Sequence, residues 1–246
     1  MPVPLLTNLN RPADIQADSK GNLYFIVQGD GTLNYLAKGS TTPQVLVKGL
    51  SKGYGVDVRN GDVYYTDWGA GTLSVLRKDT TTPTVLLSGL STPCGCAVDS
   101  KGNVYWVDLA EGTLNVLYAG STTPVTLLSG LNVPMGVAVD QKGNIYYTEY
   151  GAGTISVLMK GATKPKLLLS GLSYPQAIAV DRKRNVFFSE NGPGAICVLY
   201  KGATSKTVIA SRGSIADMDG LAVDKKGNVY YTVWGYEATL WKIPVS

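Results

Sequence analysis

The chain has 246 residues, with 22 Lys and Arg against 18 Asp and Glu and no histidine, a formal net charge of +4. So mild a charge does not indicate a nucleic-acid partner. No apolar run of about 18 residues predicts a transmembrane helix, and three cysteines do not make a disulfide framework. The 29 Gly and 15 Tyr against 3 Phe, together with many Val, Thr and Leu, are typical of strands and turns.

The chain begins with a short apolar segment, Val3 to Leu6, and then repeats one pattern to its end. The copies that begin at Pro93 and Pro134 stand 41 positions apart, and six repeats of about 41 residues account for all 246. An aromatic pair marks the register of each copy, at Tyr24–Phe25, Tyr64–Tyr65, Tyr105–Trp106, Tyr146–Tyr147, Phe187–Phe188 and Tyr230–Tyr231.

Each copy reads as four short strands separated by turns. In the fourth copy the alternation of apolar residues predicts strands over 137–140, 145–149, 154–159 and 166–170, with Gly-rich turns between them. No stretch has helical periodicity. Four antiparallel strands in each repeat predict the blade of a β-propeller.

The two ends of the chain predict how the ring closes. Val3 to Leu6 matches the fourth strand of the other copies, and residues 239–243 match the third strand. The last blade should therefore take its outer strand from the N-terminus, which pairs an otherwise open sheet edge. The sequence thus predicts an all-β fold, a six-bladed β-propeller with four antiparallel strands in each blade, and a single domain over residues 1–246.

The repeat motif resembles a known family. The pattern Pro-x-Gly-x-Ala-Val-Asp-x-x-Gly-Asn-Val-Tyr at Pro93 and Pro134 is similar to the NHL repeat, and Tyr64 to Asp67 resembles the YWTD repeat of lipoprotein receptors. The resemblance covers all six copies and implies a six-bladed propeller. Propellers of this kind include sensor domains of bacterial receptor kinases, RNA- or protein-binding modules, and lyases or lactonases, so the resemblance leaves the function open.

Propeller connectivity sorts the loops onto two faces. Loops from strand four to strand one and from strand two to strand three share one face, which we call the upper face; the other turns form the lower face. The lower turns are rich in Lys and Arg. The upper loops carry Asp14, Asp30, Asp67, Asp108, Glu111, Glu149, Glu190, Asp217, Asp219 and Glu237. We therefore expect a disc that is acidic above and basic below.

Two upper positions vary from copy to copy in an otherwise regular repeat. The residue after the acidic position is Gln28, Trp68, Leu109, Tyr150, Asn191 or Trp234, and the Pro-x-Gly slot holds Tyr54, Cys94, Met135, Gln176 or Met218. Aromatic faces beside carboxylates suit a cation, a sugar ring or a basic peptide. The candidate ligand-binding residues are Trp68, Tyr150, Trp234, Asp67, Asp108, Glu149, Glu190, Asn191, Tyr54, Met135 and Gln176.

Structural roles compete with this interpretation. Loop tips that are free of constraint vary in the same way, and Asp67, Asp108, Glu149 and Glu190 stand where related repeats bond neighbouring backbone. Cys94 and Cys96, two positions apart on one strand, should point to the same side and serve as packing residues, with Cys94 the more reachable at the rim.

The absence of histidine excludes Ser-His-Asp and Cys-His nucleophile pairs and histidine-bound zinc. We expect a non-catalytic recognition or sensor domain that binds a small-molecule, glycan or peptide ligand on its upper face. The alternative is an enzyme, a lyase, a hydrolase or a strictosidine-synthase-like condensing enzyme, in which a carboxylate such as Glu149 or Glu190 acts as acid or base. A closed pocket with one isolated, desolvated carboxyl group would favour the enzyme, and an open rim would favour recognition.

We expect no metal and no cofactor, and the acidic upper face disfavours nucleic acid. A monomer is expected. The compartment stays open, with an extracytoplasmic domain of a larger protein or a secreted protein favoured.

Overall fold

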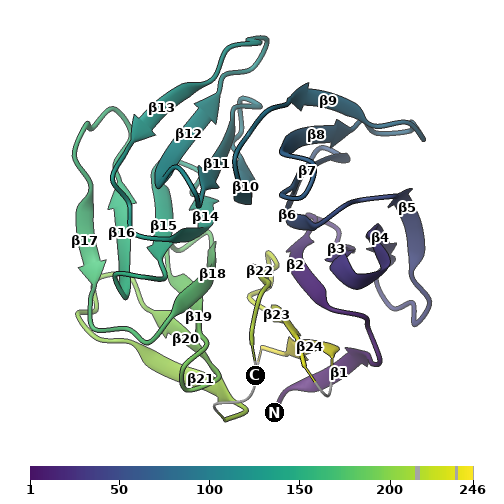
Figure 1. The fold of residues 1–246 in the computed structure, drawn as a ribbon. Coiled ribbons are helices and arrows are strands. Elements are labelled where there is room, and N and C mark those ends of the chain that lie inside the picture. The colour runs from purple at the N-terminus through teal and green to yellow at the C-terminus, as the bar shows by residue number, and fades with distance from the viewer. Residues whose placement is uncertain (214–216, 236–237, 246) are drawn as a thin grey trace.

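The computed structural model describes residues 1–213, 217–235 and 238–245. Within these residues six four-stranded antiparallel sheets stand around a central axis as the blades of a propeller (Figure 1). The predicted fold is therefore confirmed. The described residues contain one short 3₁₀ turn, η1 (Gln28–Asp30), between two strands of blade 1.

The strands run from the axis outward in each blade. Blade 1 holds β2 (Pro12–Ala17), β3 (Leu23–Val27), β4 (Thr32–Leu36) and β5 (Gln44–Lys48). Blade 2 holds β6 (Gly53–Arg59), β7 (Asp62–Asp67), β8 (Thr72–Leu76) and β9 (Thr84–Leu87). Blade 3 holds β10 (Pro93–Val98), β11 (Val104–Asp108), β12 (Thr113–Leu117) and β13 (Val125–Leu128).

The second half of the ring follows the same order. Blade 4 holds β14 (Pro134–Val139), β15 (Ile145–Glu149), β16 (Thr154–Leu158) and β17 (Lys166–Leu169). Blade 5 holds β18 (Pro175–Val180), β19 (Val186–Glu190), β20 (Ala195–Leu199) and β21 (Thr207–Ser211). Blade 6 holds β22 (Leu221–Val223), β23 (Val229–Val233), β24 (Thr239–Ile243) and β1 (Val3–Leu6).

The ring closes as the sequence predicts. Strand β1 from the N-terminus pairs antiparallel with β24, with Val3 opposite Lys242 and Leu6 opposite Leu240 (Figure 1). Leu6 is buried in the cluster that joins blade 6 to blade 1. Both ends of the chain are thereby held in one sheet.

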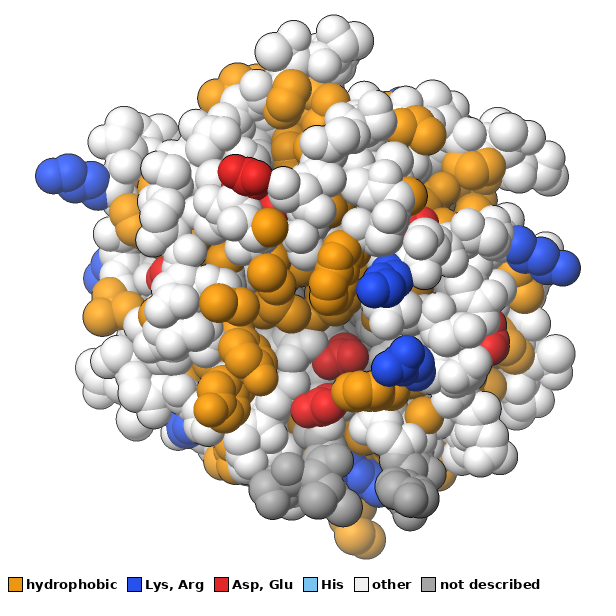
Figure 2. Space-filling view, in the orientation of Figure 1, with side chains coloured by type: hydrophobic (Ala, Val, Ile, Leu, Met, Phe, Trp, Pro, Cys, Tyr) orange, Lys and Arg blue, Asp and Glu red, His pale blue; other side chains and the backbone are white. Residues whose placement is uncertain are grey.

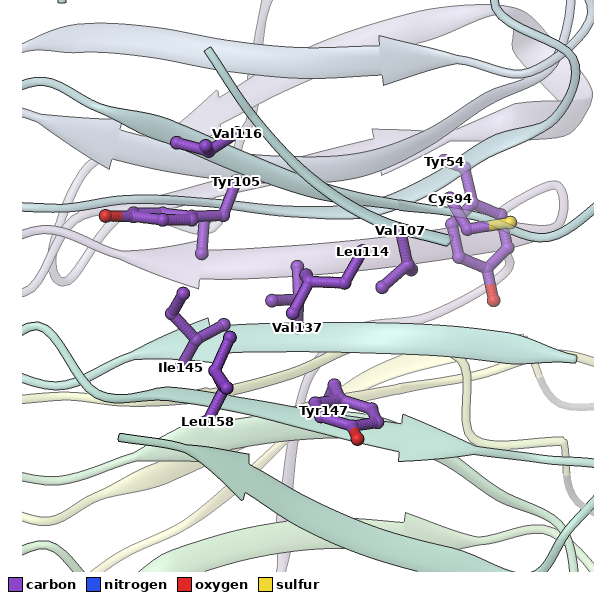
Figure 3. Packing of buried hydrophobic residues seen from close by; sticks show 11 residues of the cluster. Tyr54, Cys94, Tyr105, Val107, Leu114, Val116, Val137, Ile145, Tyr147 and Leu158 are labelled. Carbon is purple, nitrogen blue, oxygen red and sulfur yellow. The ribbon is translucent and has the colours of Figure 1, made fainter. Parts of the chain in front are cut away.

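The core is divided among the contacts between neighbouring blades. Six clusters of buried side chains lie one at each boundary. At the boundary of blades 3 and 4, Val107 and Leu114 face Val137 and Tyr147 (Figure 3). The aromatic pair of the repeat therefore belongs to the core, and its two rings pack on opposite sides of their blade. Tyr147 packs at the boundary of blades 3 and 4, and Tyr146 packs at the boundary of blades 4 and 5.

The inner strands begin earlier than the apolar alternation predicts. Strand β14 starts at Pro134, and its register against β15 shifts between Pro134 and Val137. The same shift in β10 separates the two neighbouring cysteines, so that Cys94 packs between blades 3 and 4 and Cys96 between blades 2 and 3. Cys94 is fully buried. The expectation that both cysteines share one side, with Cys94 reachable, is wrong because a bulge breaks the two-residue alternation of a strand.

Two devices hold the inner strands close together. A Cβ at Gly136 would stand 2.4 Å from the carbonyl oxygen of Gln176 on the next blade, so the position requires glycine. Beside it, Thr148 accepts a hydrogen bond from the Gly136 N–H (2.9 Å) and donates one to the Gln176 carbonyl (2.8 Å). Thr66, Ser189 and Thr232 make the same two kinds of bond in blades 2, 5 and 6.

We expect Thr148→Val to lower the free energy of unfolding by about 1–3 kcal/mol, because it leaves a buried N–H and a buried carbonyl without a partner. Thr148→Ser should keep most of the stability, since blade 5 uses Ser189 at this place. Urea denaturation of both variants measures the difference. Equal stability of the valine and serine variants would contradict a bridging role for the hydroxyl group.

Candidate ligand-binding site on the propeller axis

A pocket of about 340 Å³ opens on the upper face at the propeller axis. Every blade contributes to its wall the residue that follows its second strand. These six residues are Gln28, Trp68, Leu109, Tyr150, Asn191 and Trp234. They are the six that the sequence marks as variable after the acidic position, so the structure brings that whole set together.

A second ring of side chains comes from the position that precedes the inner-strand glycine, or that precedes Asp14 and Ala177, which replace this glycine in blades 1 and 5. Five blades place this residue in the pocket: Ala13, Tyr54, Met135, Gln176 and Asp219. In blade 3 the equivalent Cys94 is buried instead. The sequence assigns Met218 to this slot in blade 6, and its carbonyl accepts the Ser189 bond as the Gln176 carbonyl accepts that of Thr148, but one more residue, Asp219, stands before the glycine and enters the pocket. Asp219 directly precedes Gly220, whose N–H bonds to Thr232, whereas Met218 is fully buried.

Aromatic side chains from alternate blades surround the opening. Trp68, Tyr150 and Trp234 come from blades 2, 4 and 6, and both tryptophans are 36% exposed. Tyr150 stacks on Tyr174 with a centroid distance of 4.8 Å. Figure 2 shows hydrophobic side chains around a central hollow on this face, with acidic side chains inside it and basic side chains at one edge.

Two cations already lie on these rings. The Arg11 guanidinium is 5.1 Å from the ring centroid of Trp234, and the Lys52 ammonium is 5.4 Å from that of Trp68. Such contacts are worth about 0.5–1 kcal/mol at exposed sites. Arg11 itself lines the pocket. The faces of these two indoles are therefore able to accept positive charge.

A hydrogen-bonded network forms one side of the pocket floor. Gln176 Nε2 donates to Tyr54 Oη (2.7 Å) and to Asp219 Oδ1 (2.5 Å), and Asn191 Nδ2 donates to Gln176 Oε1 (2.5 Å). Asn191 Oδ1 in turn accepts the backbone N–H of Met218 (3.1 Å). The Gln176 amide is thereby fixed in orientation, with both of its N–H groups used.

The four acidic candidates Asp67, Asp108, Glu149 and Glu190 are not among the residues that line this pocket. Asp67 accepts backbone N–H bonds from Ser51, Lys52 and Ala70, and Asp108 accepts the corresponding bonds from Ser91, Thr92 and Glu111. Glu149 accepts from the Asn132 N–H and the Thr154 hydroxyl. Glu190 accepts from the Ser173 N–H and pairs with Lys206. These carboxylates shape the upper loops.

Asp217 and Asp219 supply the negative charge of the pocket. The sequence places them on the upper face but not among the candidate ligand residues. Burial and the nearby Asp217 charge raise the pKa of Asp219, and the hydrogen bond from Gln176 lowers it. The result is a pKa of about 7. The position of Asp219 before Gly220 is the signal that a correct alignment of the sixth repeat would have used.

Two further carboxyl groups stand deeper on the inner strands. Asp14 takes the place of the inner-strand glycine in blade 1, lines a small cavity beneath the pocket, and accepts the Val56 N–H of blade 2 (3.1 Å). Asp57 accepts the Val98 N–H of blade 3 (2.6 Å). Burial raises the pKa of Asp14 to about 7 and that of Asp57 to about 6. Asp14 therefore belongs to an inner strand and not to an upper loop.

The expected acidic upper face needs revision. Asp67, Asp108, Glu149 and Glu190 accept backbone N–H groups, and Asp30 and Glu111 each accept one side-chain bond in the loops. Asp217 and Asp219 stand at the axis. Glu237 lies outside the described residues. The lower face holds a wider groove of about 650 Å³ between blades 1 and 2, with Lys20, Arg59, Arg77 and Lys78 in its lining. Similar grooves lie between blades 6 and 1 and between blades 4 and 5. Grooves of this kind lie at three of the blade boundaries, so they do not mark one site.

No model of a known protein family matches the chain, and no curated protein matches it. Solved structures do share its fold. A gluconolactonase from Xanthomonas campestris is 13% identical with a TM-score of 0.83, over 100% of this chain and 89% of that one. A chain of a nidogen/laminin complex is 18% identical with a TM-score of 0.75, over 83% of this chain and 81% of that one.

A third similar structure is the virginiamycin B lyase of Staphylococcus aureus with quinupristin, in a form made inactive by replacing a histidine with alanine. It is 15% identical with a TM-score of 0.73, over 96% of this chain and 81% of that one. Identities this low show the fold alone, and the three proteins include both a binding protein and enzymes. The described residues of this chain contain no helix long and apolar enough to cross a membrane.

We expect Asp219→Asn to stabilise the protein at pH 8 by roughly 1–4 kcal/mol and to have little effect at pH 4. The pKa of Asp219 is about 7 in the native state and near 3.8 when the chain unfolds, so native stability falls as the pH rises from about 4 to about 7. The asparagine cannot ionise and keeps the oxygen that accepts from Gln176. The other charged or titratable groups at this pocket, Asp217, Arg11, Tyr54 and Tyr150, are the same in both proteins.

Thermal unfolding across this pH range measures the difference. The exposed Asp79→Asn is the control, because its backbone φ of 60° suits asparagine and it removes the same charge on the opposite face. An Asp219→Asn effect that does not change with pH would contradict the raised pKa.

Proposed function

We propose that this chain is a non-catalytic recognition domain that binds a small-molecule, glycan or peptide ligand in the axial pocket of its upper face. The proposal is supported chiefly by the location of the positions at which the six repeats differ. Six blades share nearly the same framework residues, and the side chains that differ most converge on one pocket. Loop tips without a role would vary as well, and the ring brings equivalent positions together, so the support for binding lies in what these positions hold: large aromatic rings and amides beside two carboxylates.

The chemistry of the lining supports binding. Large aromatic faces, amide groups in a fixed network and two carboxylates offer apolar contact together with a few oriented polar groups, which is the usual composition of a ligand site. Among the described residues of the lining there is no serine, threonine or cysteine to serve as a nucleophile. The pocket also opens to solvent beside exposed tryptophans.

One observation favours the enzymatic alternative. A carboxyl group with a pKa of about 7, as in Asp219, suits general acid–base catalysis near neutral pH. The group is not isolated, however, because Gln176 donates to it and the Asp217 charge acts on it. An enzyme would therefore use Asp219, in place of the Glu149 or Glu190 that the sequence suggested.

We further propose that the repeats are of the NHL type, on the strength of the motif at Pro93 and Pro134, and that residues 1–246 act as one monomeric domain. The nidogen/laminin complex shows a propeller of this fold in a protein–protein assembly, and the lactonase and lyase show it in enzymes. The fold is compatible with both classes of function, and it is the lining of the pocket that favours recognition.

We expect alanine at Trp68, Tyr150 or Trp234 to lower the affinity of this pocket for its ligand by roughly 5- to 30-fold. Each substitution removes an aromatic face that contributes about 1–2 kcal/mol to binding. Ligands would be found by ligand-observed NMR with peptide, oligosaccharide and small-molecule libraries, and affinities measured by calorimetry. Tyr118→Ala and Tyr200→Ala are matched controls, since both tyrosines are about half exposed on the lower face.

Ligands whose affinity is unchanged in all three pocket variants would rule out this site. Turnover of a bound compound that is lost in Asp219→Asn while its binding persists would establish the enzymatic alternative instead.

A further inference from the structure

The carboxylates of the upper face fall into two kinds. Asp67 and Asp108 each accept three backbone N–H bonds and have little capacity left for a ligand. Asp219 accepts only the Gln176 amide, at Oδ1, and no described residue donates to its Oδ2. Within the described parts of the chain, no group donates to the Asp217 carboxylate. Asp30 and Glu111 each accept one side-chain bond and lie outside the pocket lining. Within the lining, Asp217 and Asp219 keep acceptor atoms that a ligand can use.

The charge of the pocket is not balanced by the protein. Arg11 is the one cationic residue among the described lining residues, against two carboxylates. Its guanidinium lies over the Trp234 ring, and no ion pair within 4 Å joins it to a described carboxylate. Lys52 is packed on Trp68 and is outside the lining. A ligand that carries positive charge would supply what the pocket lacks.

Burial makes this deficit costly. An ionised carboxylate away from bulk water is unfavourable unless it has a partner, and burial together with the Asp217 charge raises the pKa of Asp219. A bound ammonium group would relieve both effects by pairing with the two carboxylates. A bound anion would add a third negative charge, with Arg11 alone to receive it.

The aromatic residues provide the rest of the recognition. Tyr54, Trp68, Tyr150 and Trp234 come from three alternate blades. The electron-rich faces of such rings attract alkylammonium groups and also cover an apolar body. Two of these rings already hold a protein cation, as Arg11 and Lys52 show. The stacking of Tyr150 on Tyr174 holds the third wall in place.

We infer that the ligand of the axial pocket is an organic cation, an amine or quaternary ammonium group on a small apolar body, paired with Asp217 and Asp219 among the aromatic rings. This inference rests on the proposed recognition function and names its ligand class. The volume of about 340 Å³ limits the buried part to a small molecule or to a single side chain, such as that of a lysine.

The test uses probes of equal shape and different charge at pH 8. The first pair is 2-phenylethylammonium and 2-phenylethanol, the second is choline and 3,3-dimethyl-1-butanol, and 3-phenylpropionate is the anion. Saturation-transfer NMR detects binding and calorimetry measures affinity, with the full chain. We expect each cation to bind ~10-fold or more tightly than its neutral partner. The primary ammonium donates charged hydrogen bonds to the carboxylates, and the quaternary ammonium of choline, which has no N–H, is attracted by their charge and by the aromatic faces.

The variant that isolates the carboxylates is Asp217→Asn with Asp219→Asn. This double variant should bind the cations with an affinity lower by ~10-fold or more, and its affinity for the alcohols should stay within ~2-fold of that of the unchanged protein. Asp79→Asn is the control for net charge, because Asp79 is exposed on the opposite face. The thermal midpoint at pH 8 confirms that the double variant is folded, and neutralising these two half-buried carboxyl groups is expected to preserve or raise it.

Failure of this inference is distinguishable from failure of the proposed function. Alcohols or 3-phenylpropionate that bind as tightly as the cations, or cations that bind the double variant unchanged, would overturn the cation class. If Trp68→Ala still lowered the affinity for those ligands, the axial pocket would remain the binding site. If no probe of any charge bound in the pocket, both would fall.

Discussion

The close approach of the six inner strands around the axis is the constraint on which the site depends. Where Gly55, Gly95, Gly136 and Gly220 stand, a Cβ would meet the backbone oxygen of the next blade at 2.4–2.7 Å. Hydroxyl groups of the second strands bridge the same gap in four blades. The side chains just before Gly55, Gly136 and Gly220 enter the axial pocket, whereas Cys94 before Gly95 is buried between blades. One small pocket thus collects inner-strand residues from several blades.

The sequence was sufficient for the architecture because the fold is periodic. The Asp that closes the first strand in five of the six copies shows why. Asp140 accepts the N–H groups of Lys142 and Asn144 and the side-chain amide of Asn144, so it fixes the turn that these copies share. Ring closure followed from two short segments, β1 and β24, that complete one sheet. The bulge in the inner strands could not be predicted, since it depends on contact with the next blade and leaves no local pattern.

The candidate site was only partly predictable for a related reason. Sequence variation located Trp68, Tyr150, Asn191, Trp234, Tyr54, Met135 and Gln176, all of which line the pocket. Charge alone could not separate Asp219 from Asp67, because the difference lies in the backbone N–H groups that surround Asp67. The irregular inner segment of blade 6 also hid Asp219. An acidic side chain has ligand-binding capacity only where the protein has not already used its oxygens.

The central claim is that the axial pocket of the upper face is where this propeller meets its ligand. Crystals of the protein soaked with 2-phenylethylammonium test it most directly, because the position of the ligand is observed. We expect its density between Trp68, Tyr150 and Trp234, with the ammonium group within hydrogen-bonding distance of Asp217 or Asp219. Density confined to the lower-face grooves between blades, for a compound that binds in solution, would contradict the claim.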